Sequence, residues 1–189
     1  MAVVSSQFCK SAGVALVYKR GWRNEEVLDL TGRPLFKVKH PSFLWNRDHY
    51  IVDLTTNAPL VRLRPQMFLP VRGTWYGYDA QRDRMLFMLR SSSIFQISMS
   101  IDVFVGSDKE PGKNRQPDYQ IKGHCFSRGI DIVRGHNQEL VAQAKGGSLW
   151  GCTEYTISVA PGVDIAFVVS LIAIVHDKRS SSNASSTTV

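Results

Sequence analysis

The chain has 189 residues, of which 43% are hydrophobic and 21% are charged, and its formal net charge is +7. This length suits one domain, which can bury enough apolar surface to fold without a disulfide or a metal. Three cysteines without a C-x-x-C pair exclude a disulfide framework, and no apolar run near the amino end is long enough for a signal peptide, so we expect an intracellular protein.

Short apolar strands separated by turn residues begin at residues 14–18. The clearest hairpin covers residues 25–39, where Gly32 provides the positive φ that its turn needs. Residues 50–64 repeat the strand–turn–strand pattern around a turn at 56–59. These segments account for the first five predicted strands.

Seven further strands follow, with turn signals at intervals of about ten residues. They are predicted at residues 75–78, 85–89, 94–105, 119–122, 130–133, 140–144 and 155–159. Regularly spaced short strands favour an antiparallel sandwich or barrel over a parallel α/β sheet. The chain therefore contains about twelve predicted strands.

One segment departs from the β pattern, because residues 163–175 are apolar on nearly every side. Asp164 lies where a carboxylate stabilises the start of a helix, and His176 and Lys178 lie where cations stabilise its end. A helix of about 13–16 residues is shorter than the roughly 20 apolar residues that span a bilayer. A helix that is apolar all round must be surrounded by protein. A buried strand is the alternative, since valine and isoleucine favour strands.

Together, these elements predict a mainly β fold. The expected architecture is a closed, antiparallel, twelve-stranded barrel that encloses a central hydrophobic C-terminal α-helix, with no transmembrane span. Residues 1–178 should form this single domain. Residues 179–189 are rich in serine and threonine and should form a disordered tail.

Basic residues alternate with apolar ones in two of the predicted strands, at 36–39 and 61–64. If the apolar residues face the core, the basic side chains face outward, and successive hairpins bring the two strands close together. Such a cluster can hold a phosphorylated lipid headgroup. The candidate headgroup-binding residues are Lys37, Lys39, Arg62, Arg64, Arg72 and Arg90. A purely structural role stays open, because exposed strand faces need polar residues in any case.

No spacing in the sequence supports an enzyme or a metal site. His124 and Cys125 are adjacent and would point to opposite faces of a strand, so they do not form a nucleophile–base pair. The five histidines show no H-x-H or H-E-x-x-H spacing. We therefore expect no catalytic activity, no metal and no cofactor. Aromatic residues beside the basic ones suit base stacking, but we interpret them as barrel core and disfavour a nucleic-acid partner.

Several short motifs, in the same order along the chain, resemble the plant LURP-one-related family over roughly residues 8–178. The matching segments are residues 29–38 (D-x-x-G-x-x-L-F-K-V), 89–93 (R-S-S), 101–106 (D-V-F), 119–123 (K-G), 155–159 and 161–167 (P-x-V-D-x-A-F). Each motif is weak alone, whereas their order is specific.

The resemblance implies the twelve-stranded barrel and central helix of tubby C-terminal domains and phospholipid scramblases. It also implies phosphoinositide binding at a membrane, with a link to plant defence. We therefore expect a monomeric, non-enzymatic protein of the cytoplasm or the plasma-membrane surface that binds anionic lipid headgroups, with entry into the nucleus left open. A scaffold that binds signalling proteins in defence and no lipid is the main alternative. A lipocalin-like carrier is another, and it would need an empty barrel.

Overall fold

The computed structural model describes residues 2–21, 24–40, 47–66, 73–93, 98–106, 112, 114–124, 129–146 and 154–184. Within these residues a short 3-10 helix, Ser6–Phe8, precedes twelve strands and a helix. The strands are β1 (Val14–Arg20), β2 (Asn24–Asp29), β3 (Pro34–Lys39), β4 (His49–Asp53), β5 (Ala58–Pro65), β6 (Trp75–Asp79), β7 (Met85–Ser93), β8 (Ser98–Val105), β9 (Tyr119–His124), β10 (Gly129–Arg134), β11 (Leu140–Gly146) and β12 (Glu154–Val159). The helix is α1 (Ile165–Ala184).

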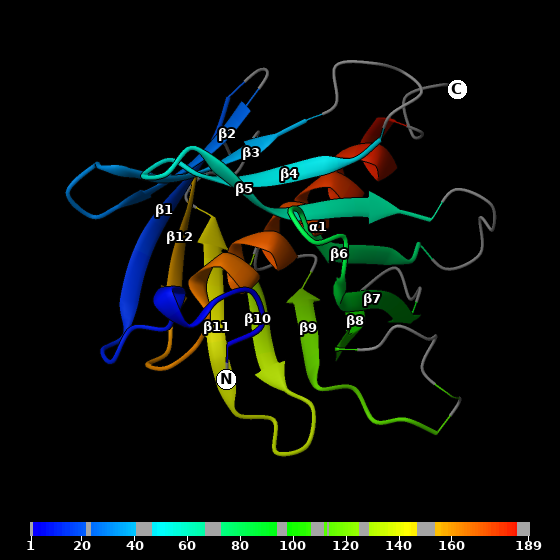
Figure 1. The fold of residues 1–189 in the computed structure, drawn as a ribbon. Coiled ribbons are helices and arrows are strands. Elements are labelled where there is room, and N and C mark those ends of the chain that lie inside the picture. Colours follow the sequence, from blue (N-terminus) through cyan, green and yellow to red (C-terminus); the bar gives the residue numbers. More distant parts are fainter. Residues whose placement is uncertain are drawn as a thin grey trace.

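The strands form a closed barrel in which each strand pairs with its neighbour in sequence (Figure 1). Closure comes from the first and last strands, which pair antiparallel in a register that sets Val14 opposite Val159 and Tyr18 opposite Tyr155. The predicted strand at 94–105 corresponds to β8, and residues 94–97 lie outside the described residues. The predicted twelve-stranded antiparallel barrel is confirmed.

Side chains alternate between core and solvent along the strands. In β12 the burial pattern is strictly alternating, with Tyr155, Ile157 and Val159 buried and the residues between them exposed. The turn between β2 and β3 also forms as predicted, since Gly32 has a φ of 85°. Asp29 stabilises this turn because its Oδ1 accepts hydrogen bonds from two backbone N–H groups of the turn.

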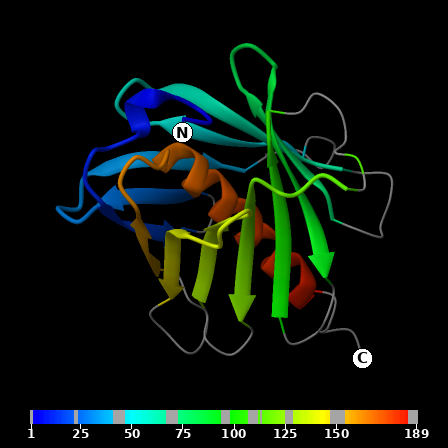
Figure 2. The ribbon, with the colours of Figure 1, turned by 90° about the horizontal axis from the view of Figure 1, so that it is seen from below.

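Helix α1 runs through the interior of the barrel, as both views show (Figures 1 and 2). Every residue from Ile165 to His176 is buried. Phe167 packs against the barrel wall, with ring centroids 5.2 Å from Phe87 and 5.3 Å from Tyr119. The segment is therefore the expected internal helix and not a buried strand.

The helix is longer than the sequence analysis expected. It has 20 residues and ends at Ala184, six residues beyond Lys178, where a disordered tail was expected to begin. Once a helix has nucleated, each added residue gains a hydrogen bond at little further cost, so helical structure continues past the apolar segment. Residues 185–189 of the expected tail lie outside the described residues.

Among the residues that the structure describes, no helix combines the length and the apolarity that a membrane crossing requires.

The start of α1 is covered by the amino-terminal segment. Asp164 is fully buried, and its Oδ1 accepts a hydrogen bond from the N–H of Phe167, which caps the helix. Its Oδ2 accepts three further bonds from the N–H groups of Val3, Val4 and Ser5, at 3.1, 2.7 and 3.0 Å. One carboxylate thus fixes both the helix start and the segment that lies over it.

Candidate binding surface

The basic residues predicted to bind headgroups lie on β3 and β5, which flank β4 on the barrel wall. Lys39 is opposite Tyr50, and Tyr50 is opposite Arg62, so these three residues form a row across the outer face. Lys37 lies two residues before Lys39, and Arg64 two residues after Arg62. The structure therefore brings all four residues to one outer face, which we call the basic face.

Lysines and arginines on the basic face differ in their partners. Lys39 is exposed and Lys37 is half-buried, and neither forms an ion pair with a residue that the structure describes. Arg64 instead forms a bidentate pair with Asp48, in which Nε donates to Oδ1 at 2.9 Å and Nη2 donates to Oδ2 at 2.8 Å. The hydrogen bonds to Asp48 raise the pKa of Arg64 above its ordinary value.

Arg62 lies between two carboxylates. Its Nη2 donates to Asp83, and its Nε lies 3.8 Å from Oδ2 of Asp48. Its guanidinium also lies over the ring of Tyr78, with 5.0 Å between Cζ and the ring centroid. Two of the four predicted cations are thus already paired with acidic residues.

The acidic partners could not be identified from the sequence. Asp48 precedes β4, and Asp83 lies in the turn between β6 and β7. Their proximity to Arg62 depends on the pairing of β4, β5 and β6, in which Arg62 is opposite both Tyr50 and Tyr78. Only the strand register brings these residues together.

The two remaining candidates do not join this row. Arg90 is on β7, and its guanidinium lies 5.5 Å from the ring centroid of Phe104 on β8. Its cross-strand partner is Asp102. Arg72 lies outside the described residues, as does Cys125.

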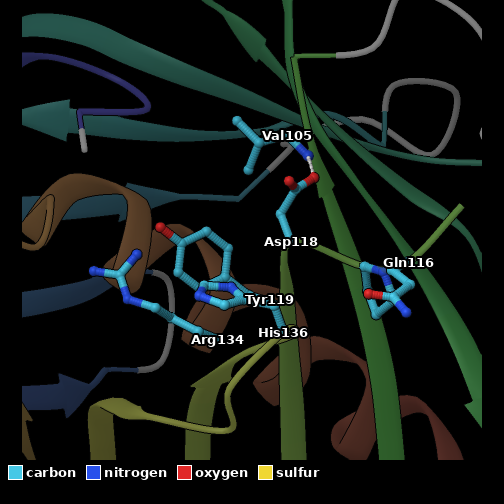
Figure 3. A pocket seen from close by; sticks show the side chains of 7 residues that line it. Val105, Gln116, Asp118, Tyr119, Arg134 and His136 are labelled. Atoms are coloured by element: carbon cyan, nitrogen blue, oxygen red, sulfur yellow. Dashed lines mark hydrogen bonds between the residues drawn. The ribbon is translucent and has the colours of Figure 1, made fainter.

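A shallow pocket of about 320 Å³ lies at one end of the barrel (Figure 3). Its lining residues are Val105, Gln116, Pro117, Asp118, Tyr119, Arg134 and His136. Its main charges are already paired, because Asp118 accepts hydrogen bonds from the Val105 N–H and from Arg115, and Arg134 donates to Glu139 at 2.8 Å. The pocket therefore offers less free positive charge to an anion than the basic face does.

A buried polar cluster lies farther along α1, toward its carboxyl end. Glu25 of β2 accepts a hydrogen bond from the hydroxyl of Tyr18, and its Oε1 lies 3.1 Å from Nδ1 of His176. Burial alone would raise the pKa of Glu25, but hydrogen bonds with His176, His40 and Tyr18 hold that pKa well below its ordinary value. The carboxylate therefore stays ionised inside the barrel wall.

Histidines extend this cluster to a second strand. Nδ1 of His40 lies 2.9 Å from Nδ1 of His49, and Nε2 of His49 lies 3.9 Å from a carboxylate oxygen of Asp177. Burial lowers the pKa of His49. Among the described residues no group of histidine, cysteine, aspartate and glutamate side chains has the arrangement of a metal site. We interpret the cluster as a structural connection between the barrel and α1.

Comparison with known proteins identifies relatives along nearly the whole chain. A family model described as LURP-one-related matches residues 17–177. Protein LURP-one-related 10 of Arabidopsis thaliana is 30% identical over 191 residues, which cover 94% of this chain and 96% of that protein. Protein LURP-one-related 15 of the same plant is 30% identical over 163 residues, which cover 82% of this chain and 72% of that protein.

A solved structure shares the fold. The X-ray structure of a protein from Arabidopsis thaliana aligns with a TM-score of 0.72 and 26% sequence identity. The alignment covers 94% of this chain and 98% of that chain. The likeness therefore extends over nearly the full length of both chains.

Proposed function

The chain belongs to the LURP-one-related family, and we propose that it is a non-enzymatic binding module for anionic membrane lipids. In this proposal the basic face holds phosphorylated headgroups, phosphoinositides among them, at the cytoplasmic surface of a membrane. The protein would act there as a monomeric regulator linked to plant defence. This last element comes from the family resemblance.

The observation that carries the proposal is the pair of lysines on β3. Lys37 and Lys39 lie on one side of the same strand and form no ion pair among the described residues, although Glu26 of β2 is opposite Lys37. Each basic residue near an anionic membrane contributes about 1 kcal/mol to binding. The net charge of +7 adds long-range attraction to the same surface.

The filled interior supports an external binding site. Side chains of α1 that face the barrel, such as Leu171 and Ile174, are fully buried, which leaves no room for a carried apolar ligand along this part of the helix. Ligand pockets need a concave space lined by a few polar groups. A carrier function is therefore disfavoured, and the outer surface is the part available for binding.

A protein-interaction scaffold is the second candidate. Tyr50 and Tyr78 are half-buried beside Arg62 on the outer face, and tyrosine and arginine are enriched at protein interfaces. This candidate predicts a signalling protein as the partner and binding that does not depend on lipid. It would also leave Lys37 and Lys39 without a defined role.

Vesicle co-sedimentation at about 0.1 M salt tests the proposal, because exposed charges still interact over a Debye length of about 10 Å under these conditions. The double variant Lys37→Gln/Lys39→Gln should sediment less with phosphoinositide vesicles than the unaltered protein does. The matched control is Lys122→Gln/Lys145→Gln, which removes the same charge from exposed positions on β9 and β11. Equal partition of the unaltered protein to neutral and phosphoinositide vesicles would contradict the proposal.

A further inference from the structure

Asp83 accepts a hydrogen bond from the guanidinium of Arg62 on the basic face. We propose that Asp83 is an internal competitor that a ligand oxyanion must displace from Arg62, and that it thereby lowers the affinity of the basic face for anionic headgroups. This inference rests on the proposed function. It assigns control over the affinity of the basic face to one acidic side chain.

Arg62 is the fixed member of this pair. Only 20% of its side chain is exposed, and the guanidinium lies over the Tyr78 ring at 5.0 Å. The buried Nε of Arg62 has no hydrogen-bond partner among the described residues and lies 3.8 Å from Asp48. Arg62 is thus held in place by packing while its hydrogen bonding stays incomplete.

Asp83 is the movable member. Its side chain is 71% exposed, in contrast to the 10% exposure of the Asp48 side chain. An exposed ion pair is weak because water solvates the separated charges well. Asp48 is fixed by its bidentate pair with Arg64. When an anion binds to Arg62, we therefore expect the ion pair with Asp83 to break, while the pairs with Asp48 stay in place.

Ligand charge decides whether the exchange is favourable. A phosphomonoester carries about −1.5 to −2 charges near pH 7 and three acceptor oxygens, whereas a carboxylate carries one charge. A phosphodiester carries one charge and so pairs more weakly with an arginine than a phosphomonoester does, but both ligands lose the same free energy when they displace Asp83. Lys39 lies in the same cross-strand row as Arg62 and would add a second cation beside the exchanged group.

The test is the substitution Asp83→Asn, which removes the charge and keeps the backbone. Asp83 has a φ of 53°, and Asn57 already adopts a φ of 55° in another hairpin turn of this barrel. Asparagine tolerates this left-handed region. The variant should therefore fold normally.

The matched control is Glu154→Gln on β12. Glu154 also forms an exposed ion pair, with Lys19 at 3.1 Å, so its loss changes the net charge by the same amount. β12 and β5 are separated by four strands on the shorter path around the barrel, β1 to β4. An effect of net charge alone should be equal in the two variants.

Binding is measured with vesicles that contain phosphatidylglycerol or a phosphatidylinositol phosphate. Asp83→Asn should raise affinity for phosphatidylglycerol vesicles by about two- to fivefold, the range that follows from the strength of an exposed ion pair. Its affinity for phosphatidylinositol phosphate should rise by the same factor, because each ligand displaces the same ion pair, so the preference between the two lipids should stay unchanged. Calorimetry with soluble inositol phosphate separates the sources of the oxyanion. Binding only on vesicles assigns the site to a lipid headgroup, and binding of the soluble compound assigns it to the phosphate group itself.

Two outcomes overturn the inference and differ in their meaning. If the unaltered protein binds anionic vesicles and Asp83→Asn behaves like Glu154→Gln, Asp83 is not a competitor and the lipid-binding proposal stands. If none of the three proteins binds any anionic vesicle or inositol phosphate, the proposed function fails and the inference fails with it.

Discussion

Nδ1 of His176, in helix α1, lies 3.1 Å from Oε1 of Glu25, in strand β2, although 151 residues separate them in the chain. Both residues are buried, with 7% and 3% exposure. The contact joins the carboxyl-terminal half of the internal helix to the barrel wall. At the start of the helix, Asp164 connects the helix to the amino-terminal segment.

Glu25→Gln should destabilise the protein, because a neutral amide replaces a buried acceptor for Tyr18, His40 and His176. The expected loss in the free energy of unfolding is about 1–3 kcal/mol, the cost of leaving buried polar groups poorly paired. Urea denaturation measures it. The neighbouring substitution Glu26→Gln is the control, since Glu26 is exposed and its loss should change stability by less than about 0.5 kcal/mol. Equal effects of the two substitutions would show that the cluster is not stabilising.

Acid should weaken the fold in two stages. Burial lowers the pKa of His49 from its ordinary 6.5, so the unfolded chain binds this proton more readily and stability falls as the pH drops below about 6.5. Glu25 also has a lowered pKa, so its contribution is present above about 4.5 and is lost as the pH falls further.

Urea midpoints between about pH 2 and pH 8 measure this dependence. His49→Gln should flatten the upper stage between about pH 5 and 6.5 and leave the lower stage in place. The groups that face His49 are His40, Glu25, Asp48 and Asp177. A stability profile of the unaltered protein that is flat across pH 5–7 would contradict this account of the cluster.

Asp164→Asn should release the amino-terminal segment, because the amide has one acceptor oxygen where the carboxylate has two. The side chain now accepts bonds from the N–H groups of Val3, Val4 and Ser5 as well as Phe167. Hydrogen exchange at the first three amides should accelerate, and stability should fall by about 1–3 kcal/mol.

Deleting residues 1–5 gives the companion measurement for Asp164. The deletion removes three of the donors, so it should also destabilise the protein. Because both changes break the same bonds, their combined effect should be smaller than the sum of the separate effects. Strict additivity would mean that Asp164 and this segment act independently.

Gly77→Ala should strain the packing between the barrel wall and the helix. A Cβ added at Gly77 would lie 2.2 Å from Cζ of Phe87, whose ring packs against Phe167. Overpacking of this kind typically costs about 1–3 kcal/mol. Thermal unfolding measures the loss, and Phe87→Leu in the same protein should recover part of it. Gly112→Ala meets no atom within 4 Å and should be close to neutral.

The fold was predictable because its signals are local. Alternation in segments such as residues 36–39 and 61–64 follows from the two-residue period of a strand, and the all-round apolar character of residues 163–175 indicates an internal helix. The end of that helix was less predictable, since residues 179–184 have no apolar pattern and extend it only by propagation.

The detail of the basic face depended on information that a single sequence lacks. Outward placement of Arg62 follows from alternation, whereas its pairing with Asp48 and Asp83 depends on the register of three strands. The contact between Glu25 and His176 could not be predicted either, because no sequence pattern links residues so far apart in the chain. The sequence therefore indicated which cations face outward but not which of them are already paired.

Footprinting of lysine reactivity tests the central claim most directly. An amine-acetylating reagent is applied to the protein alone and to the protein bound to phosphoinositide vesicles, and mass spectrometry measures acetylation at each lysine. The account predicts that vesicles protect Lys37 and Lys39 while Lys122 and Lys145 stay as reactive as in the free protein. Vesicle-bound protein in which Lys37 and Lys39 react as they do in solution would show that the basic face does not contact the membrane.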